Sequence, residues 1–342
     1  MAIEVIRDWR DLTPDQKGAA VAIGAFDGVH RGHQAVIASA RTAAQALDAP
    51  LAVVSFDPHP RRWFQPDAAP FRLMTPDQMA RALEPLGVER LYLLPFDAAM
   101  AAMSDEDFAR DVLAGPSPQA ARSAIGQNTP QVARSAVGQK DGLGIRHAAV
   151  GFDFTFGKGR TGSPEALRRY GETLGFTVSL TDRIDDPDGL KLSSSAVREA
   201  LKAGDMARAA AILGRPFAIA GEVIHGDKRG RTIGVPTANI GLADYMRPAY
   251  GVYATRSRLP KGGKWGGRIL DGVANLGIRP MFETEQPMLE VWLFDFDGDL
   301  YGQTLETDLI AHLRGEMNFD GLEPLKLQIA IDAAAARHVL AG

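Results

Sequence analysis

The sequence predicts two domains: an α/β domain built on a parallel sheet, followed by a small antiparallel β-barrel with a terminal helix. Three observations lead to this fold class. Up to residue 185, short apolar runs alternate with helical patterns, as expected for strands and helices around a parallel sheet. From residue 216 the apolar residues alternate with a period of two, which indicates antiparallel strands. The length of 342 residues suits two such domains.

The first domain is predicted to span residues 1–185. Its expected strands are 21–23, 51–56, 90–94 and 147–150, and its expected helices are 34–47, 76–86 and 105–113. The stretch 115–144 contains a short repeat rich in Ala, Ser, Gln and Gly, which we interpret as an inserted surface loop. Parallel sheets bind ligands beyond the carboxyl ends of their strands, so functional residues are expected at that edge.

The second domain is predicted to span residues 216–342, after a linker and connecting helix at 186–215. A helical pattern covers 201–213, and the chain ends with another at 322–340. The expected strands of the barrel are 217–224, 251–257, 269–276 and 289–296.

The composition limits the possible partners and chemistry. A net charge of −4 gives no overall basic field, so nucleic acid is not an expected partner. The sequence has no cysteine, which excludes disulfides, thiolate metal sites and cysteine nucleophiles. There is no signal-peptide core and no apolar run as long as a membrane span. We therefore expect no membrane partner, a cytoplasmic location, and a monomer or weak homo-oligomer.

The most specific motif occupies residues 24–33, at a predicted strand-to-helix turn. Its glycines, which include Gly24 and Gly28, let the backbone approach a phosphate closely, and the helix start offers N–H groups. His30 and His33 are three residues apart and share one face of the first turn, where two imidazoles can donate hydrogen bonds to a phosphoryl group. The alternative is a glycine-rich turn with two surface histidines.

Two loops at the same predicted edge add positive charge and aromatic rings. Phe56, Pro58, His59 and Arg61 belong to a segment in which two prolines predict an extended loop. Residues 151–160 combine three alternating aromatic rings with glycines and basic residues, which suits ring stacking and phosphate neutralisation. The alternatives are a solvated basic loop and a β-hairpin with a basic tip.

Three hydroxyls, those of Ser193, Ser194 and Ser195, precede a predicted helix that runs to about residue 203. One of them is expected to cap the helix, because serine is a favoured N-cap residue. The helix start, the hydroxyls and Arg198 can also bind a phosphate together. Capping alone is the alternative.

The second domain carries a glycine-rich basic loop formed by Gly226, Lys228, Gly230, Arg231 and Gly234. Such a loop can cradle phosphates, although this one does not follow the Walker pattern. A basic hairpin followed by a proline turn is the alternative.

Oxygen-bearing side chains follow this loop. Thr237 and Asn239 offer a hydroxyl and an amide oxygen two residues apart, which are hard ligands suited to Mg²⁺ shared with ATP phosphates.

Glu290 is the candidate general base, because a carboxylate among aromatic rings is expected to be partly desolvated. A strand-end glutamate in water is the alternative. Strand alternation separates two faces: Leu289, Val291 and Leu293 on one, and Glu290, Trp292, Phe294 and Phe296 on the other.

These motifs resemble a known family. Residues 24–33 resemble the His-x-Gly-His signature of the nucleotidylyltransferase superfamily, and their longer form looks like the adenylyltransferase module of bacterial bifunctional riboflavin kinase/FAD synthetases. The string that ends in Pro-Thr-Ala-Asn at Asn239 is similar to the riboflavin kinase signature. The resemblance covers nearly the whole chain except the predicted insert. Met281 is a second departure, since the family usually has Thr there.

The resemblance implies a Rossmann-like nucleotidylyltransferase domain at 1–185 and a riboflavin kinase-like barrel at 216–342. It implies a bifunctional transferase that phosphorylates riboflavin with ATP to give FMN and then adenylylates FMN to FAD, with release of pyrophosphate. The implied ligands are ATP, riboflavin, FMN and FAD, with Mg²⁺ accompanying ATP.

The resemblance also implies residue roles, of which His30, His33, Arg198 and Glu290 are the catalytic ones. For adenylyl transfer, the ATP-binding residues would be Gly24, Phe26, Asp27, Gly28, His30, His33, Asp153, Ser194, Ser195 and Arg198. The flavin and phosphate side of that site would be bordered by Phe56, Pro58, His59 and Arg61. For the kinase, the ATP-binding residues would be Gly226, Lys228, Gly230, Arg231, Gly234, Thr237 and Asn239, of which Thr237 and Asn239 would hold the metal.

Three other functions remain open at this point. One is a single-activity enzyme in which one module has become a scaffold. A second is a nucleotidylyltransferase that uses another phosphorylated acceptor. The third is a flavin-binding regulatory or storage protein without turnover, which would need none of the histidines, Glu290 or the metal ligands.

Overall fold

The computed structural model describes residues 2–115, 142–186, 189–225, 234–259, 265–281 and 284–342; at 279–281 and 284–286 it describes the backbone alone. The chain divides into two compact units. The N-terminal unit contains Met1–Ala68 and Pro76–Lys191. The C-terminal unit contains Leu192–Gly342 and takes in the short segment Ala69–Thr75, which lies between two parts of the N-terminal unit in sequence.

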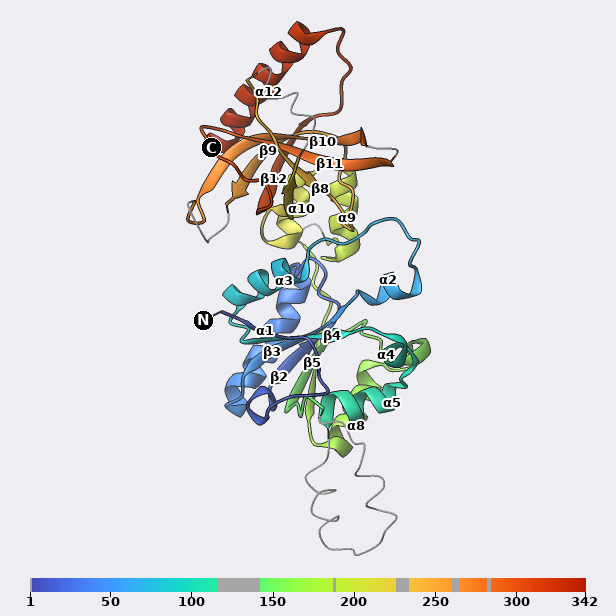
Figure 1. Ribbon diagram of the computed structural model, residues 1–342. Coiled ribbons are helices and arrows are strands. Elements are labelled where there is room, and N and C mark those ends of the chain that lie inside the picture. Colours follow the sequence, from blue (N-terminus) through green and yellow to red (C-terminus); the bar gives the residue numbers. More distant parts are fainter. Residues whose placement is uncertain (1, 116–141, 187–188, 226–233, 260–264, 282–283) are drawn as a thin grey trace, which may run out of the picture. The chain divides into compact units, whose positions relative to one another are not determined.

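The N-terminal unit is built on a six-stranded parallel sheet (Figure 1). Its strands are β1 (Glu4–Ile6), β2 (Ala20–Ile23), β3 (Leu51–Asp57), β4 (Arg90–Pro95), β5 (His147–Gly151) and β6 (Thr177–Thr181). Their order is β1-β4-β3-β2-β5-β6, so the chain builds outward from β2 first on one side and then on the other. The boundary between β2 and β5 is therefore a topological switch point, where parallel sheets bind ligands.

Helices cover both faces of this sheet (Figure 1). The helices are α1 (Arg31–Leu47), α2 (Pro60–Phe64), α3 (Pro76–Leu83), α4 (Ala98–Ala102), α5 (Asp105–Asp107) and α8 (Pro164–Leu174), with a π-helical segment at Phe108–Ala114 and 3-10 turns at Pro14–Gln16, Glu84–Leu86 and Lys158–Arg160. On one face, α1 packs Ile37 and Ala40 against β2 and β5. On the other face, Phe108 and Leu167 are buried in one apolar cluster with Val21 and Val54.

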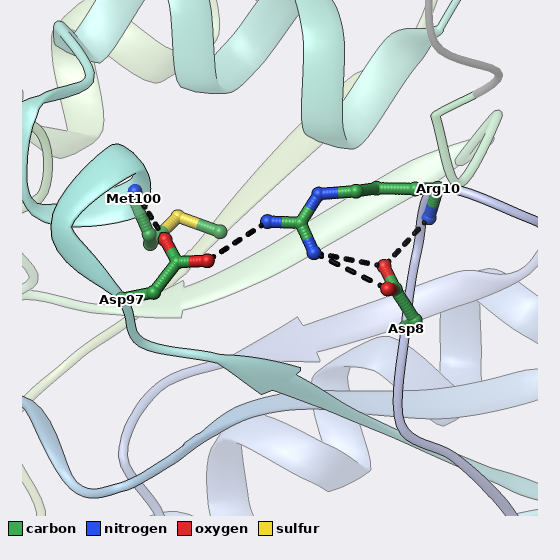
Figure 2. Close-up of polar contacts among 4 residues, drawn as sticks. All are labelled: Asp8, Arg10, Asp97 and Met100. Carbon is green, nitrogen blue, oxygen red and sulfur yellow. Dashed lines mark hydrogen bonds and ion pairs between the residues drawn. The ribbon is translucent and has the colours of Figure 1, made fainter.

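The chain before β2 is tied to the end of β4 by one arginine (Figure 2). Arg10 donates from Nη2 to Asp97 Oδ2 at 3.1 Å and from Nη1 to Asp8 Oδ1 at 3.2 Å. Asp97 also caps α4, because its Oδ1 accepts a hydrogen bond from Met100 N at 2.8 Å. The Met100 N–H, and then the Arg10 guanidinium, hold the pKa of Asp97 below its ordinary value.

The C-terminal unit is a closed antiparallel barrel of six strands (Figure 1). The strands are β7 (Phe217–Ile224), β8 (Ala238–Gly241), β9 (Gly251–Arg258), β10 (Ile269–Met281), β11 (Thr284–Leu293) and β12 (Thr304–Arg314), and they close in the order β10-β11-β8-β7-β12-β9. The helices of this unit are α9 (Ser194–Ala203), α10 (Met206–Leu213) and α12 (Leu322–Ala341). Buried residues of α9 and α10 share one core with the barrel interior, and α12 packs on the outside of β9, β10 and β12.

The predicted fold class is confirmed in both units, but the segment after β3 is not the extended loop that its prolines predict. Helix α2 begins at Pro60, where a missing N–H costs little because a first-turn N–H has no partner within the helix. The ring of His59 caps α2 by accepting a hydrogen bond from Arg61 N at 3.1 Å. The prediction took both prolines to fix an extended loop, whereas Pro60 starts the helix.

The predicted helix over 201–213 starts too early, because α9 occupies its first residues and α10 begins only at Met206. α9 ends at Ala203, and Gly204 adopts a left-handed conformation with φ of 75°. Asp205 then caps α10 by accepting a hydrogen bond from Arg208 N at 2.8 Å. The apolar spacing continues across the break, so periodicity did not reveal it.

The predicted strand over 289–296 is too long. β11 ends at Leu293, and the chain turns through Phe294 and Asp295, which has a φ of 54°. The sequence analysis also missed β1, β6, β8 and β12. The interpretation of 115–144 as an insert concerns residues that mostly lie outside the described part of the chain.

The cap at Asp97 predicts a pH-dependent stability. Replacing Asp97 with Ala should lower the free energy of unfolding by about 1 kcal/mol at pH 7, the usual cost of losing an N-cap. Because the folded pKa of Asp97 is lowered, this contribution is present above the unfolded value of about 3.9 and disappears as the pH falls through the folded value. Urea unfolding at pH 7 and at about pH 3 measures the difference.

The matched control is Asp97→Asn, which keeps a good capping oxygen but loses the charge next to Arg10. We expect it to cost less than Asp97→Ala at pH 7. A difference between wild type and Asp97→Ala that stays constant down to pH 3 would contradict this role.

Candidate functional site

The loops that follow β2, β3 and β5 carry the predicted site residues of the N-terminal unit. The three strands are neighbours in the sheet, in the order β3-β2-β5. Because they are parallel, their carboxyl ends meet at one edge, and the switch point lies between two of them. The sheet therefore brings the histidine motif, the segment from Phe56 to Arg61 and the loop around Asp153 to the same edge.

The turn after β2 is held tightly against β3. Gly24 N donates to Val54 O at 3.1 Å, and the buried hydroxyl of Ser55 donates to Ala25 O at 2.9 Å. The turn closes with a hydrogen bond from Val29 N to Phe26 O at 3.0 Å. This backbone is therefore fixed before any ligand arrives.

Two non-glycine residues of this turn have positive φ: Phe26 at 49° and Val29 at 42°. A β-branched residue in the left-handed region is a genuine outlier, and such a position costs on the order of 1–3 kcal/mol. Both side chains are buried, which supplies packing that offsets the strain. Gly28 has a φ of 91° and meets the same requirement without a Cβ. Strain of this kind is concentrated at ligand-binding sites.

The two histidines lie against each other at the start of α1. Their ring centroids are 3.6 Å apart with planes 21° from parallel, and the ring of Phe26 lies 5.0 Å from that of His33. His30 is the N-cap of α1, because its Nδ1 accepts a hydrogen bond from His33 N at 3.2 Å. The helix consequently begins at Arg31, three residues before the predicted start. A neutral His30 ring that accepts at Nδ1 carries its proton on Nε2, which makes Nε2 a hydrogen-bond donor.

Asp153 lies two residues beyond the end of β5 and is exposed. Its Oδ2 is 2.6 Å from the Nζ of Lys191, which also lies 4.9 Å from the centre of the Phe152 ring. Asp153 is therefore paired with a cation. Sequence analysis did not single out Lys191, which sits in a polar turn far along the chain.

Aromatic rings form a continuous cluster at this edge, which we call the aromatic cluster. Phe56 contacts Phe96 at 5.7 Å and Phe108 at 6.3 Å, and Phe108 contacts Phe156 at 5.7 Å between ring centroids. The members are Phe56, Trp63, Phe64, Phe96, Phe108, Phe154 and Phe156. Phe64 is 64% exposed, so the cluster reaches the surface and offers flat apolar area to a planar ligand.

The remaining residues of the N-terminal unit lie on or before α2. The Asp57–Pro58 peptide bond is cis, and it turns the chain from β3 into the helix. His59 caps α2, and Arg61 Nε donates to Gln65 Oε1 at 3.3 Å on the exposed surface. Both side chains therefore make local contacts, which fits the structural alternative as well as a binding role.

The serine motif belongs to the C-terminal unit. Ser193 is the N-cap of α9, since its hydroxyl accepts a hydrogen bond from Ala196 N at 3.2 Å. Ser194 and Ser195 therefore occupy the first turn, and this turn contains no acidic residue. That arrangement favours an anion at the helix start. Arg198 lies one turn further along the same helix.

In the barrel, strand register brings the kinase candidates together. Glu290 on β11 lies directly opposite Asn239 on β8 and opposite Asn275 on β10. Residues opposite each other in adjacent antiparallel strands point to the same face, so these three side chains form one row. Glu290 is half-buried, and Asn239 is buried. Sequence analysis named Asn275 only as part of a matching string and gave it no role.

A cavity of about 540 Å³ is lined by Ala238, Val291 and Leu293, the strand residues that alternate with this row and therefore point to the opposite face. Thr237, Phe296, Asp299 and Tyr301 are among the residues that line it. The ring of Tyr301 lies 3.8 Å from that of His225, the last described residue before the glycine-rich basic loop. The lining of the cavity mixes apolar side chains with the carboxylates of Asp297 and Asp299.

The predicted row of three aromatics beside Glu290 is only partly present. Trp292 and Phe294 pack into the apolar cluster beneath α12. Phe296 packs instead with the barrel interior and lines the cavity, because the strand ends before it and the alternation is lost.

Several predicted residues cannot be placed. Gly226, Lys228, Gly230 and Arg231 lie outside the described residues, as does the side chain of Met281. Gly234 is described and exposed, with a φ of 80°. Among the described residues, no group of three or more His, Cys, Asp or Glu side chains could hold a metal ion.

The fold and these two sites define a nucleotide-using enzyme of two modules, and comparison with known proteins gives the family. The FAD synthetase family profile matches residues 12–129 and 137–196, and the riboflavin kinase profile matches residues 213–340. The break at 130–136 falls within the predicted insert. The first match ends inside α9, whereas compactness groups all of α9 with the barrel.

Full-length relatives agree with both profiles. The bifunctional riboflavin kinase/FMN adenylyltransferase of Pseudomonas fluorescens is 39% identical over 99% of this chain and 98% of its own length. The proteins of the same description from Escherichia coli K12 and Bacillus subtilis are 37% and 36% identical, over 98% and 95% of this chain and 97% and 93% of their own lengths. The chain belongs to the family of bifunctional riboflavin kinase/FMN adenylyltransferases.

One solved structure shares the fold over almost the whole chain. A Streptococcus pneumoniae protein described as a macrolide-efflux protein has a TM-score of 0.75 and 28% identity, covering 98% of this chain and 99% of that one. That description applies to the streptococcal protein. None of the helices in the described part of this chain is long and apolar enough to cross a membrane.

Proposed function

We propose that this chain makes FAD from riboflavin in two ATP-dependent steps, one on each module. The kinase step transfers a phosphoryl group from ATP to riboflavin and gives FMN and ADP. The adenylyltransferase step joins FMN to the AMP part of a second ATP and releases pyrophosphate. The observation that supports this proposal is that one chain matches both family profiles, FAD synthetase over residues 12–129 and 137–196 and riboflavin kinase over residues 213–340.

In the adenylyl step, an oxygen of the FMN phosphate attacks the α-phosphorus of ATP and the bond to pyrophosphate breaks. No covalent enzyme intermediate is needed, because the acceptor is itself the nucleophile. The site must stabilise negative charge on the α-phosphoryl group, which preorganised donors do well. We assign this role to His30 through Nε2 and to His33, whose ring stacks on that of His30.

The other residues of this step hold the two substrates. Ser194, Ser195 and Arg198 offer hydroxyls, first-turn N–H groups and a guanidinium, which suit the triphosphate. The aromatic cluster offers a surface for the planar isoalloxazine ring of FMN, beside Phe56 and Pro58. Asp153 and the turn around Gly24, Asp27 and Gly28 complete the nucleotide side.

In the kinase step, the terminal ribityl hydroxyl of riboflavin attacks the γ-phosphorus of ATP. We assign to Glu290 the removal of the hydroxyl proton, because its carboxylate stands between Asn239 and Asn275 on one face of the barrel. The cavity lined by Thr237 and Tyr301 takes one of the two substrates, and we propose ATP. Catalysis of this kind depends mostly on placement and on neutralising charge.

Mg²⁺ is part of the proposal for the kinase module. The hydroxyl of Thr237, which lines the cavity, and the amide oxygen of Asn239 are neutral, hard donors two residues apart. When bound, the ion would neutralise charge on the ATP phosphates.

We also propose the cytoplasm as the compartment, because both steps consume ATP. A flavin-storage function is disfavoured, since storage needs neither Glu290 nor the stacked histidines.

Replacing His30 with Asn separates its two roles. Asn is a good N-cap, so α1 should keep its start, but the imidazole donor is lost. We expect FAD formation from FMN to fall by about 100-fold or more, the usual cost of removing one such donor. FMN formation from riboflavin should stay within about twofold of wild type, because that reaction uses the other module. Both rates can be measured by flavin chromatography on the same sample.

The converse variant is Glu290→Gln, which is isosteric but cannot accept the proton. We expect FMN formation to fall by about 100-fold or more, as is typical for loss of a general base. FAD formation from supplied FMN should be unchanged. If Glu290→Gln retains full kinase activity, Glu290 is not the base.

A further inference from the structure

Arg198 is held by a residue far away in the sequence. Its Nε donates a hydrogen bond to the backbone carbonyl of Phe71 at 2.8 Å. Its guanidinium carbon also lies 5.4 Å from the centre of the Phe71 ring, which is within cation–π range. Two contacts with one residue therefore restrain the position of the guanidinium.

Phe71 is itself fixed by the barrel's own polypeptide. Its neighbour Arg72 donates from its backbone N to Asp244 O at 3.1 Å, and its carbonyl accepts from Met246 N at 2.8 Å. These bonds form a short parallel bridge between Arg72 and Tyr245. Phe71 is only 4% exposed, and Leu73 is buried in the core that α9 and the barrel share. The carbonyl that receives Arg198 therefore has little freedom to move.

The helix that carries Arg198 is equally well anchored. Val197, Ala200 and Leu201 are buried in the same core, and Ala249 N donates to Leu201 O at 2.9 Å. A long arginine side chain nevertheless has many rotamers even on a rigid helix. The contacts of the guanidinium with Phe71 restrict these rotamers, which the rigid helix alone does not do. Phosphate recognition by arginine depends on the planar geometry of the guanidinium.

We propose that Phe71 is a positioning residue for adenylyl transfer, which holds the guanidinium of Arg198 in the orientation that binds the triphosphate of ATP. This inference rests on the proposed function, in which Arg198 is a phosphate ligand. The segment Ala69–Thr75, which carries Phe71, belongs to the same compact unit as α9. The proposed role makes Phe71 a residue of the adenylyl site that touches no substrate.

The test compares Phe71→Ala, Phe71→Leu and Phe71→Tyr in the full chain. Phe71→Leu keeps apolar bulk but removes the ring, and Phe71→Tyr keeps the ring. We expect Phe71→Ala to lower kcat/KM for ATP in FAD formation by about tenfold, with Phe71→Leu also reduced and Phe71→Tyr within about twofold of wild type. FMN formation reports on folding, because the kinase barrel and Phe71 lie in the same compact unit, and it should stay within about twofold.

A double-mutant cycle with Arg198→Ala decides between positioning and simple packing. If Phe71 acts through Arg198, adding Phe71→Ala to Arg198→Ala should cause no further loss of FAD formation. A further tenfold loss in that background would overturn the proposal, as would equal losses in both activities. Failure of the proposed function looks different: wild type would make no FAD, or Arg198→Ala alone would leave FAD formation unchanged.

Discussion

The hydrogen bond from His33 N to His30 Nδ1 fixes the geometry at the start of α1, where we propose the adenylyl site. It starts α1 at the switch point of the sheet and sets the tautomer of His30. It also holds the two rings in a stack with centroids 3.6 Å apart. The strained turn before it depends on β3, through Gly24 N and the hydroxyl of Ser55. A local cap and a sheet edge thus produce one rigid donor array.

In the barrel, the candidate residues are positioned by strand register and not by a helix cap. There, antiparallel register places Asn239, Glu290 and Asn275 in one row across three strands. Register is strongly specified when one face of a strand is buried, and Leu289, Val291 and Leu293 are buried inside the barrel. The apolar face of β11 therefore determines where its carboxylate points.

Much of the fold and of the candidate sites was predictable, because it follows from the local spacing of residues in the sequence. The strand-turn-helix position of the histidines, the serine cap of α9 and the inward face of β11 all come from spacing, and the structure confirms them. The secondary-structure predictions that failed depended on single residues that can take either of two structural roles. Pro60 starts a helix where an extended loop was expected, and Gly204 ends one where apolar spacing continues.

The contacts that sequence could not reveal are long-range ones between residues with no motif of their own. Ser55 had a weak signal, as a polar residue in an apolar strand. The sequence signal was weaker still for three residues whose contacts are made only by the fold: Phe71, Lys191 and Asn275. Phe71 contacts Arg198, Lys191 contacts Asp153, and Asn275 lies opposite Glu290. The role of Phe71 is visible only once the segment that carries it is seen to join α9.

The most direct test of the account is flavin chromatography after incubation of the purified chain with riboflavin, ATP and Mg²⁺, followed in time. The account predicts that FMN appears first and FAD follows, and that FMN supplied in place of riboflavin is converted to FAD without a lag. Bound riboflavin with no consumption of ATP would contradict the account and would favour a flavin-binding protein without turnover.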